Sequence, residues 1–261
     1  MANQEQNGIC REIGARTGGD IYIGVVGPVR SGKSTFIKRF MEQLVLPAIG
    51  PAAARERARD ELPQSAAGRT IMTTEPKFIP ETAVPLQLEG GGECRVRLID
   101  CVGYMVEGAM GHEENDKPRM VKNPWFDHEV PFDLAAETGT RKVICEHSTI
   151  GIVVTTDGSV SDIPREGYAR TEKRIVEELD ALGKPYIILL NSTHPDAPET
   201  KQLAEGMARD YGHTVLPVSC VDLDAEALGS ILRQVLYEFP VRELDFALPR
   251  WVTMLENGHW L

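Results

Sequence analysis

One short segment constrains the fold more than any other: a glycine-rich loop between a buried strand and an amphipathic helix. Residues Ile21–Gly27 form a continuous apolar run, IYIGVVG, which is typical of a strand buried on both faces of a parallel sheet. Residues Gly27–Ser34 follow with GPVRSGKS, which fits the pattern GxxxxGK[ST]. Residues Lys33–Leu46 then carry apolar side chains at helical spacing. Because this pattern binds phosphate in the order strand, loop, helix, we predict a nucleotide-binding loop here.

The residue types of this loop suit the phosphates of a nucleotide. Glycines let backbone N–H groups turn inward around the β-phosphate, and the start of the helix adds its positive end. Lys33 is expected to bridge the β- and γ-phosphates, and Ser34 to bind the cofactor Mg²⁺. Arg30 has two interpretations, a guanidinium aimed at the transferring phosphate or a side chain facing solvent. The predicted nucleotide contacts are Gly27, Pro28, Val29, Arg30, Ser31, Gly32, Lys33, Ser34 and Thr35.

A second motif lies at the end of another predicted strand. Residues 95–100 read RVRLID, and Asp100 begins the pattern DxxG, which ends at Gly103. Asp100 can hold Mg²⁺ through a water molecule, and the N–H of Gly103 can bond the γ-phosphate. After a phosphate-binding loop and at a strand end, we interpret this pattern as a metal and γ-phosphate sensor.

The segment between the two motifs, GRTIMTTEP at residues 68–76, holds a pair of threonines. Switch GTPases place a threonine here, whose hydroxyl binds Mg²⁺ and whose carbonyl helps to place the attacking water. Thr73 and Thr74 are the catalytic candidates, with Thr74 also a candidate metal ligand and Thr70 a weaker third. A threonine pair is also common in ordinary loops, and that interpretation stays open. No carboxylate or glutamine is obvious as a base beside these motifs, so we expect slow turnover through positioning and charge neutralisation.

The remaining pattern alternates strands and helices. We therefore predict an α/β fold, a P-loop NTPase three-layer sandwich with a mostly parallel sheet and an antiparallel edge strand. A hairpin is expected from Lys77–Leu88 and Cys94–Asp100. Further strands are expected at Gly151–Thr156, Pro185–Asn191 and Thr214–Ser219, and helices at 51–63, Asp133–His147, Arg165–Leu182, Glu199–Tyr211 and Ala225–Phe239.

The chain is expected to divide into three parts. Residues 1–19 are polar and glycine-rich and form a lead-in, residues 20–240 form the P-loop domain, and residues 241–261 form a C-terminal segment. Residues 104–131 are too long for a structureless connection and favour a functional insertion within the domain. The C-terminal segment either leads to regions absent from this chain, docks on a partner, or packs on its own domain.

Composition narrows the partners. A net charge of −11 disfavours nucleic acid and anionic lipid as partners, since both are negatively charged. No run of about 18 apolar residues would span a membrane, and the five cysteines include no CxxC pair. We expect an intracellular protein with reduced thiols and, at most, peripheral or partner-mediated contact with a membrane. The histidines have no metal-ligand spacing.

The order of strand, phosphate loop, threonine loop, hairpin and DxxG resembles the plan of the translation-factor-related P-loop GTPases. That class carries NKxD after its next-to-last strand, where this chain reads Asn191-Ser192-Thr193-His194. Asn191 remains and is a predicted nucleotide contact, but the lysine and aspartate are gone, and Asp196 lies two residues too far. That aspartate accepts hydrogen bonds from guanine N1 and N2, which adenine lacks, so the basis for guanine preference is lost. Residues 219–221, Ser-Cys-Val, occupy the place of the loop that supports the base.

Longer stretches resemble the stage IV sporulation protein A family of spore-forming Firmicutes. They include GPVRSGKSTFIKRFME, DELPQSAAGRTIMTTEPKF, LIDCVGY, NPWF and LYEFPVRELDFALP, and the similarity covers nearly all of the 261 residues. The resemblance implies Lys33 as the phosphate-loop lysine, Asp100 as the Mg²⁺-associated aspartate, and Thr73 and Thr74 as sensor threonines. It also implies an ATPase whose hydrolysis drives self-polymerisation into the basement layer of the spore coat.

The same resemblance implies a place in the mother-cell cytoplasm, at the forespore surface. It implies as partners further copies of itself, the small peptide stage V sporulation protein M, and other spore coat proteins. The latter contacts are expected through regions absent here. Two other functions stay open from the residues alone. One is a regulatory GTPase-like switch, and the other is a nucleotide-stabilised scaffold without turnover.

Overall fold

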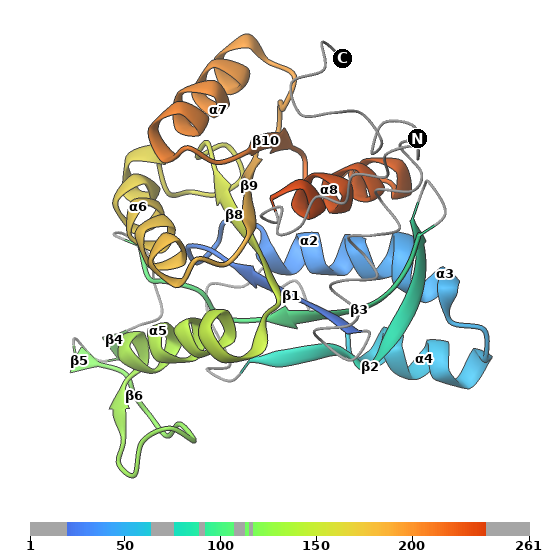
Figure 1. Ribbon diagram of the computed structural model, residues 1–261. Helices are drawn as coiled ribbons and strands as arrows, with labels where there is room; N and C mark the ends of the chain where they lie inside the picture. Colours follow the sequence, from blue (N-terminus) through green and yellow to red (C-terminus); the bar gives the residue numbers. More distant parts are fainter. Residues whose placement is uncertain (1–19, 64–75, 89–91, 107–112, 115–116, 239–261) are drawn as a thin grey trace, which may run out of the picture.

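The computed structural model describes residues 20–63, 76–88, 92–106, 113–114 and 117–238, and a six-stranded sheet in the order β10-β9-β8-β1-β3-β2 runs through them (Figure 1). Neighbouring strands are parallel except β2 and β3, which are antiparallel. This confirms the predicted mostly parallel sheet with an antiparallel edge strand. The strands are β1 Asp20–Val26, β2 Lys77–Leu88, β3 Gly92–Asp100, β8 Ile150–Thr156, β9 Tyr186–Asn191 and β10 Val215–Val218.

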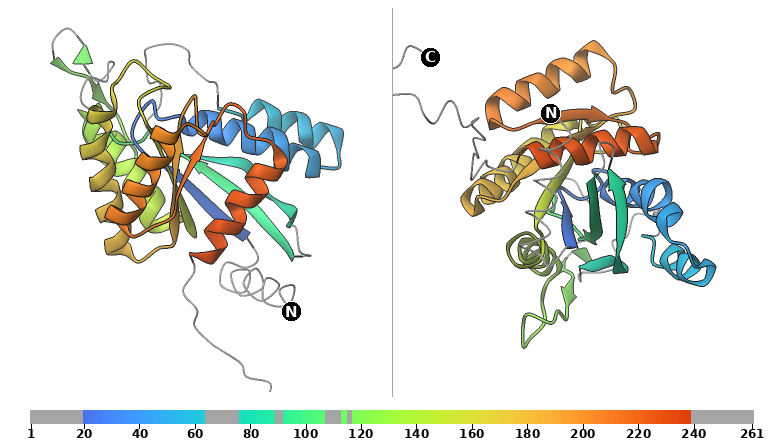
Figure 2. Two further views of the ribbon diagram at one scale, coloured as in Figure 1. Left: turned by 90° about the horizontal axis from the view of Figure 1, so that it is seen from above. Right: turned by 45° about the vertical axis from the view of Figure 1, so that its right-hand side comes forward.

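Helices cover both faces of the sheet, as the alternating pattern predicts (Figure 2). The described helices are α2 Lys33–Phe40, α3 Leu46–Ala48, α4 Ala52–Asp60, α5 Phe132–Lys142, α6 Arg165–Leu182, α7 Pro198–Tyr211 and α8 Ala225–Tyr237. β9 illustrates why its sequence, YIILLN, has no polar alternation. Ile187 and Leu189 pack in a core with α2 and α8, while Ile188 and Leu190 pack in a second core with α6 and α7.

The first helix continues two residues past Leu46, the end of the range with helical spacing. After α2 the chain widens into a π-helical segment, Met41–Val45, and then continues as α3 through Pro47. Proline has no N–H and its ring crowds the carbonyl four residues earlier, so a wider turn before Pro47 accommodates it. The helix therefore ends at Ala48, two residues past the predicted end at Leu46 and before the turn residues Gly50 and Pro51. A second π-helical segment, Val143–His147, extends α5 over the range predicted as one helix.

The predicted insertion holds two small antiparallel pairs that no pattern indicated. β4 (Glu113–Glu114) pairs with β5 (Lys117–Pro118), and β6 (Met120–Val121) pairs with β7 (Val130–Pro131). β7 leads directly into α5, so the insertion ends against the main domain. The lead-in 1–19 and the segment 241–261 lie outside the described residues, and their predicted roles stay predictions. In the part of the chain that is described, no helix has the length and apolarity to span a bilayer.

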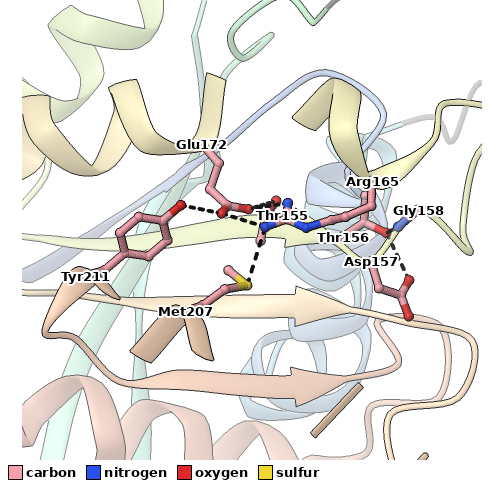
Figure 3. A network of polar contacts seen from close by, with 8 residues as sticks. All are labelled: Thr155, Thr156, Asp157, Gly158, Arg165, Glu172, Met207 and Tyr211. Carbon is pink, nitrogen blue, oxygen red and sulfur yellow. Dashed lines mark hydrogen bonds and ion pairs between the residues drawn. The ribbon is translucent and has the colours of Figure 1, made fainter. Parts of the chain in front are cut away.

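A buried polar network ties β8 to two helices (Figure 3). Glu172 of α6 is fully buried, and its carboxylate binds the Arg165 guanidinium through two bonds of 2.7 and 2.8 Å. The hydroxyls of Thr155 on β8 and Tyr211 on α7 donate to the same carboxylate at 2.6 and 2.7 Å. A buried carboxylate is tolerated when its oxygens are this fully paired. The network fixes the carboxyl end of β8, which lies beside the phosphate-binding loop.

Replacing Glu172 with alanine should destabilise the fold by about 3–5 kcal/mol, because Arg165 would remain as a partly buried, unpaired cation. Urea unfolding of the wild type and the variant measures this difference. Glu177→Ala on the same helix is the matched control. Glu177 is 65% exposed and lies 3.9 Å from Lys173, so its loss should cost at most about 0.5 kcal/mol. Equal losses in the two variants would contradict the prediction.

Candidate nucleotide-binding site

The predicted phosphate loop is tightly wound between β1 and α2. Gly27 has φ 146°, and a Cβ there would lie 2.2 Å from the carbonyl oxygen of Val154 on β8. Gly32 has φ 107°, and a Cβ there would lie 2.2 Å from the side-chain nitrogen of Asn191. Arg30, at φ 61°, is the non-glycine residue with a left-handed backbone in the described part of the chain. Only glycine allows this close approach of the backbone. As at every helix start, the first N–H groups of α2 have no acceptor within the helix.

Lys33 lies folded back over this loop rather than extended into solvent. Its ammonium group donates to the carbonyl of Pro28 at 2.6 Å and to that of Gly27 at 3.2 Å. Only 5% of the residue is exposed, and burial lowers its pKa, while nearby Cys101 and Asp100 act in the opposite direction. An ammonium carries three donors, so the two carbonyls leave one N–H for an anion. A phosphate beside it would complete the set and favour the charged form.

Asp100 ends β3 next to β1, where the pattern DxxG places it. Its Oδ1 atom is buried and has no hydrogen-bond partner among the described residues. Burial raises the pKa of Asp100 to about 6, and the charge of Lys33 opposes that rise. An unpaired carboxylate oxygen is a ligand that Mg²⁺ prefers, and Mg²⁺ at nucleotide sites takes one or two protein ligands plus phosphates. Asp100 and the half-buried Ser34 on the first turn of α2 therefore fit the predicted metal.

Gly103 brings backbone directly against the lysine. At its φ of 96°, a Cβ would lie 2.3 Å from the Gly27 carbonyl oxygen and 2.4 Å from Lys33 Nζ. The next residue, Tyr104, pairs with the loop on both sides: its N–H donates to Gly27 at 3.1 Å, and its carbonyl accepts from Val29 at 2.8 Å. The DxxG segment and the phosphate loop thus form one unit around Lys33.

Asn191 connects this unit to the loop after β10. Its side-chain N–H donates to the Ser31 carbonyl at 3.0 Å, and its side-chain oxygen accepts from the Cys220 N–H at 3.0 Å. The residue is 4% exposed. Both ends of the amide are therefore used within the protein, so Asn191 acts as a clamp between the two loops. Its predicted contact with the nucleotide itself stays a prediction.

The other predicted site residues differ in burial, and some of them lie outside the described residues. Pro28 and Val29 are buried, and Arg30 and Thr35 are half-buried. Burial raises the pKa of the Tyr168 phenol on α6, and the nearby charge of Arg30 acts in the opposite direction. The catalytic role of Arg30 stays a prediction. Thr73 and Thr74, with the weaker candidate Thr70, lie outside the described residues.

Two contacts of the site had no sequence signal. Thr140, on α5, accepts the Gly103 N–H at 3.2 Å, and Tyr104 makes the pairing described above. Thr140 lies 37 residues from Gly103, within an ordinary helical pattern. Only the path of the chain brings it to the site. A known three-dimensional template, rather than any local motif, could have found it.

The ends of β1, β3, β8 and β9 therefore meet at a site for a polyphosphate. The carboxyl edge of a parallel sheet is where such folds bind ligands. Among the described residues, no group of three or more histidine, cysteine, aspartate or glutamate residues could form a metal cage. A metal here would depend on phosphate oxygens as well as on Asp100 and Ser34.

Comparisons with known proteins agree with this geometry. The family model "Stage IV sporulation protein A, ATPase domain" matches residues 4–240. Stage IV sporulation protein A of Bacillus anthracis is 52% identical over 257 residues, and that of Clostridioides difficile is 49% identical over 255; each covers 98% of this chain and 52% of the relative. The chain thus spans about half the length of the curated relatives it matches.

A solved structure shares the fold at low sequence identity. The crystal structure of a point variant of Aquifex aeolicus Era bound to GDP and aluminium fluoride has a TM-score of 0.50 and 13% identity. The match covers 86% of this chain and 58% of that one. It supports the predicted P-loop GTPase-like architecture and nothing about the substrate of this chain.

Replacing Gly103 with alanine should lower affinity for ATP and ADP at least about tenfold, because the added methyl group would collide with the Gly27 carbonyl and Lys33 Nζ. Isothermal calorimetry measures the loss. Gly206→Ala on α7 is the control, since nothing lies within 4 Å of an added Cβ there. That variant should bind like the wild type and gain up to about 1 kcal/mol of stability. Unchanged binding by Gly103→Ala would refute the proposed packing around Lys33.

Proposed function

Because this chain belongs to the stage IV sporulation protein A family, and matches its ATPase domain, we propose that it hydrolyses ATP to drive its own polymerisation into the spore coat basement layer. The observation that best supports hydrolysis is the arrangement of groups around Lys33. A buried ammonium, the unpaired oxygen of Asp100 and the backbone of Gly103 surround one phosphate-binding loop. Family membership supports the role in sporulation.

The proposed mechanism relies on positioning and charge. The loop N–H groups bind the β-phosphate, and Lys33 neutralises charge that develops on the γ-phosphate and the leaving oxygen. Asp100 and Ser34 would hold Mg²⁺, which supplies further charge neutralisation at the phosphates when bound. Thr73 and Thr74 would place the attacking water, and Arg30 would add a second cation from within the loop. With no general base proposed, turnover is slow.

The residues at the base end support the proposal that the chain has lost selectivity for guanine. At the NKxD position, the asparagine side chain is hydrogen-bonded to the backbone of Ser31 and Cys220, and His194 stands where the aspartate would be. The Asp196 carboxylate, which lies two residues further, is 96% exposed and binds Lys201 at 2.9 Å. An acceptor for the N1 and N2 hydrogens of guanine is therefore missing from this motif. Without it, a site has no means to prefer GTP by the large factors that such acceptors give.

One acidic side chain does belong to the loop that supports the base. Asp222 is exposed, and its carboxylate accepts a hydrogen bond of 2.6 Å from the Ser219 hydroxyl. We propose that Asp222 stabilises the conformation of that loop and does not recognise guanine. The assignment is testable, because a guanine-reading Asp222 would make GTP turnover depend on its carboxylate.

The proposals for the whole assembly rest on the family. They are a homopolymer in the mother-cell cytoplasm at the forespore surface, and contacts with stage V sporulation protein M and other spore coat proteins. Since the chain spans about half of its relatives, the partner contacts are proposed for regions outside this chain.

Phosphate release with ATP and GTP at matched concentrations tests the proposed activity. We expect clear turnover of ATP, little of GTP, and pelleting of the protein after incubation with ATP. Lys33→Ala should lower ATP turnover at least about 100-fold and abolish pelleting, because the buried ammonium is lost. The control is Lys38→Ala, on the same helix, whose side chain is 43% exposed and lies 3.9 Å from Glu42. It should behave like the wild type.

Three outcomes separate the alternatives. Equal turnover of ATP and GTP would overturn the base-selectivity argument. Bound nucleotide with no phosphate released over hours would favour the scaffold, and tight retention of GDP would favour the switch. If GTP is the preferred substrate and Asp222→Ala loses that preference, Asp222 reads guanine and the ATPase proposal fails.

A further inference from the structure

The backbone N–H of Gly103 already has a partner in the folded chain. It donates at 3.2 Å to the hydroxyl oxygen of Thr140, a residue of α5 that is 1% exposed. That hydroxyl donates its own proton to the carbonyl of Ala136 at 2.8 Å. A backbone N–H can only donate and a backbone carbonyl can only accept, so the Thr140 oxygen is the acceptor of the first bond and its proton is used in the second. The buried Cys101 thiol lies beside both the Thr140 hydroxyl and the Gly103 N–H.

This N–H belongs to the residue that lies against Lys33 of the phosphate-binding loop. A Cβ added at Gly103 would lie 2.4 Å from Lys33 Nζ, so the glycine lets the backbone approach the ammonium closely. The inference rests on the proposed function, in which a γ-phosphate binds at Lys33. An anionic phosphate oxygen is a stronger acceptor than a neutral hydroxyl, and one N–H makes one short bond at a time. Triphosphate and Thr140 therefore compete for the same donor.

The neighbours of Gly103 confine this exchange to a single peptide unit. Tyr104 pairs with the phosphate loop through both backbone groups, and its phenol donates to Glu178 of α6. The carbonyl of Met105 accepts from the Thr171 hydroxyl of α6 at 3.1 Å. The segment after Gly103 is thus fixed to α6, while glycine at φ 96° can turn its own N–H without a side-chain clash.

We propose that Thr140 is a positioning residue that withholds the Gly103 N–H until a terminal phosphate displaces it, and so lowers the affinity for nucleoside triphosphate relative to diphosphate. The diphosphate has no γ-phosphate to claim the N–H, so its binding leaves the bond to α5 intact. Thr140 touches no reacting atom and acts through Gly103. It also reports the nucleotide state to α5, the helix that follows the insertion.

Thr140→Val tests this, because valine keeps the shape of threonine and removes the acceptor. We expect affinity for a non-hydrolysable ATP analogue to increase about fivefold, the range of one net hydrogen bond. Affinity for ADP should stay within about twofold, and Thr140→Ser should restore both wild-type values. The matched control, Thr138→Val, makes the same exchange at a half-buried position of α5 and should change neither affinity.

A change of equal size for analogue and ADP would overturn the proposal, since it would mean a general effect on folding of the site. No change for either ligand would overturn it as well. A wild type that binds neither ATP nor its analogue refutes the proposed function instead. If the wild type prefers GTP, the ratio of tri- to diphosphate affinity is measured with guanine nucleotides, and the Thr140 prediction is unchanged.

Wild-type protein gives a second measurement if Thr140→Val does not fold. In a ¹⁵N-labelled chain, the Gly103 amide resonance should shift on addition of the ATP analogue and remain near its free position with ADP. The Thr138 amide, on the same helix, is the internal reference. An amide of Gly103 that responds equally to both nucleotides would refute the exchange.

Discussion

Burial of the Lys33 ammonium is the constraint on which the rest of the site depends. Burial disfavours the charged form and lowers the pKa of this lysine, so the surroundings must compensate for the lost water. Two loop carbonyls and the nearby Asp100 do so only in part. In the proposed function, a triphosphate with its metal ion would satisfy the remaining donor of Lys33 and the unpaired oxygen of Asp100 together. The free protein is thus built around a charge pattern that a nucleotide completes.

The sheet explains why these groups meet. β1 lies between β3 and β8, and these three strands are parallel, so Gly27, Asp100 and Thr156 reach the same edge. The backbone can close around Lys33 because glycines stand where side chains would collide. The buried Glu172 network then fixes the end of β8, and Asn191 fixes the loop from the side of β9. The residues that stabilise the fold and the residues that bind phosphate therefore lie at the same edge of the sheet.

Sequence predicted the parts of the site that are local. The loop at 27–35 follows one buried strand, and Asp100 and Gly103 stand at the end of another. A motif at the end of an apolar run can be recognised from the sequence alone. The apolar runs also gave the strand and helix order. What stayed hidden depends on contacts far apart in the chain: Thr140 reaches Gly103 across 37 residues, and the π-helical segments respond to packing and to Pro47. The small strands β4 to β7 are two residues each, too short for any periodicity.

The contacts of Asn191 explain how such a fold can change its base without losing its phosphate chemistry. The asparagine of the motif serves the phosphate loop, through Ser31, and the base-supporting loop, through Cys220. Its loss would leave buried polar groups of both loops unpaired. An aspartate three positions later serves only guanine, so its replacement by His194 leaves the Lys33 site intact. Different residues recognise the base and bind the phosphates. A hydrolase that loses selectivity for guanine should therefore keep the asparagine, here Asn191, and lose the aspartate, here replaced by His194.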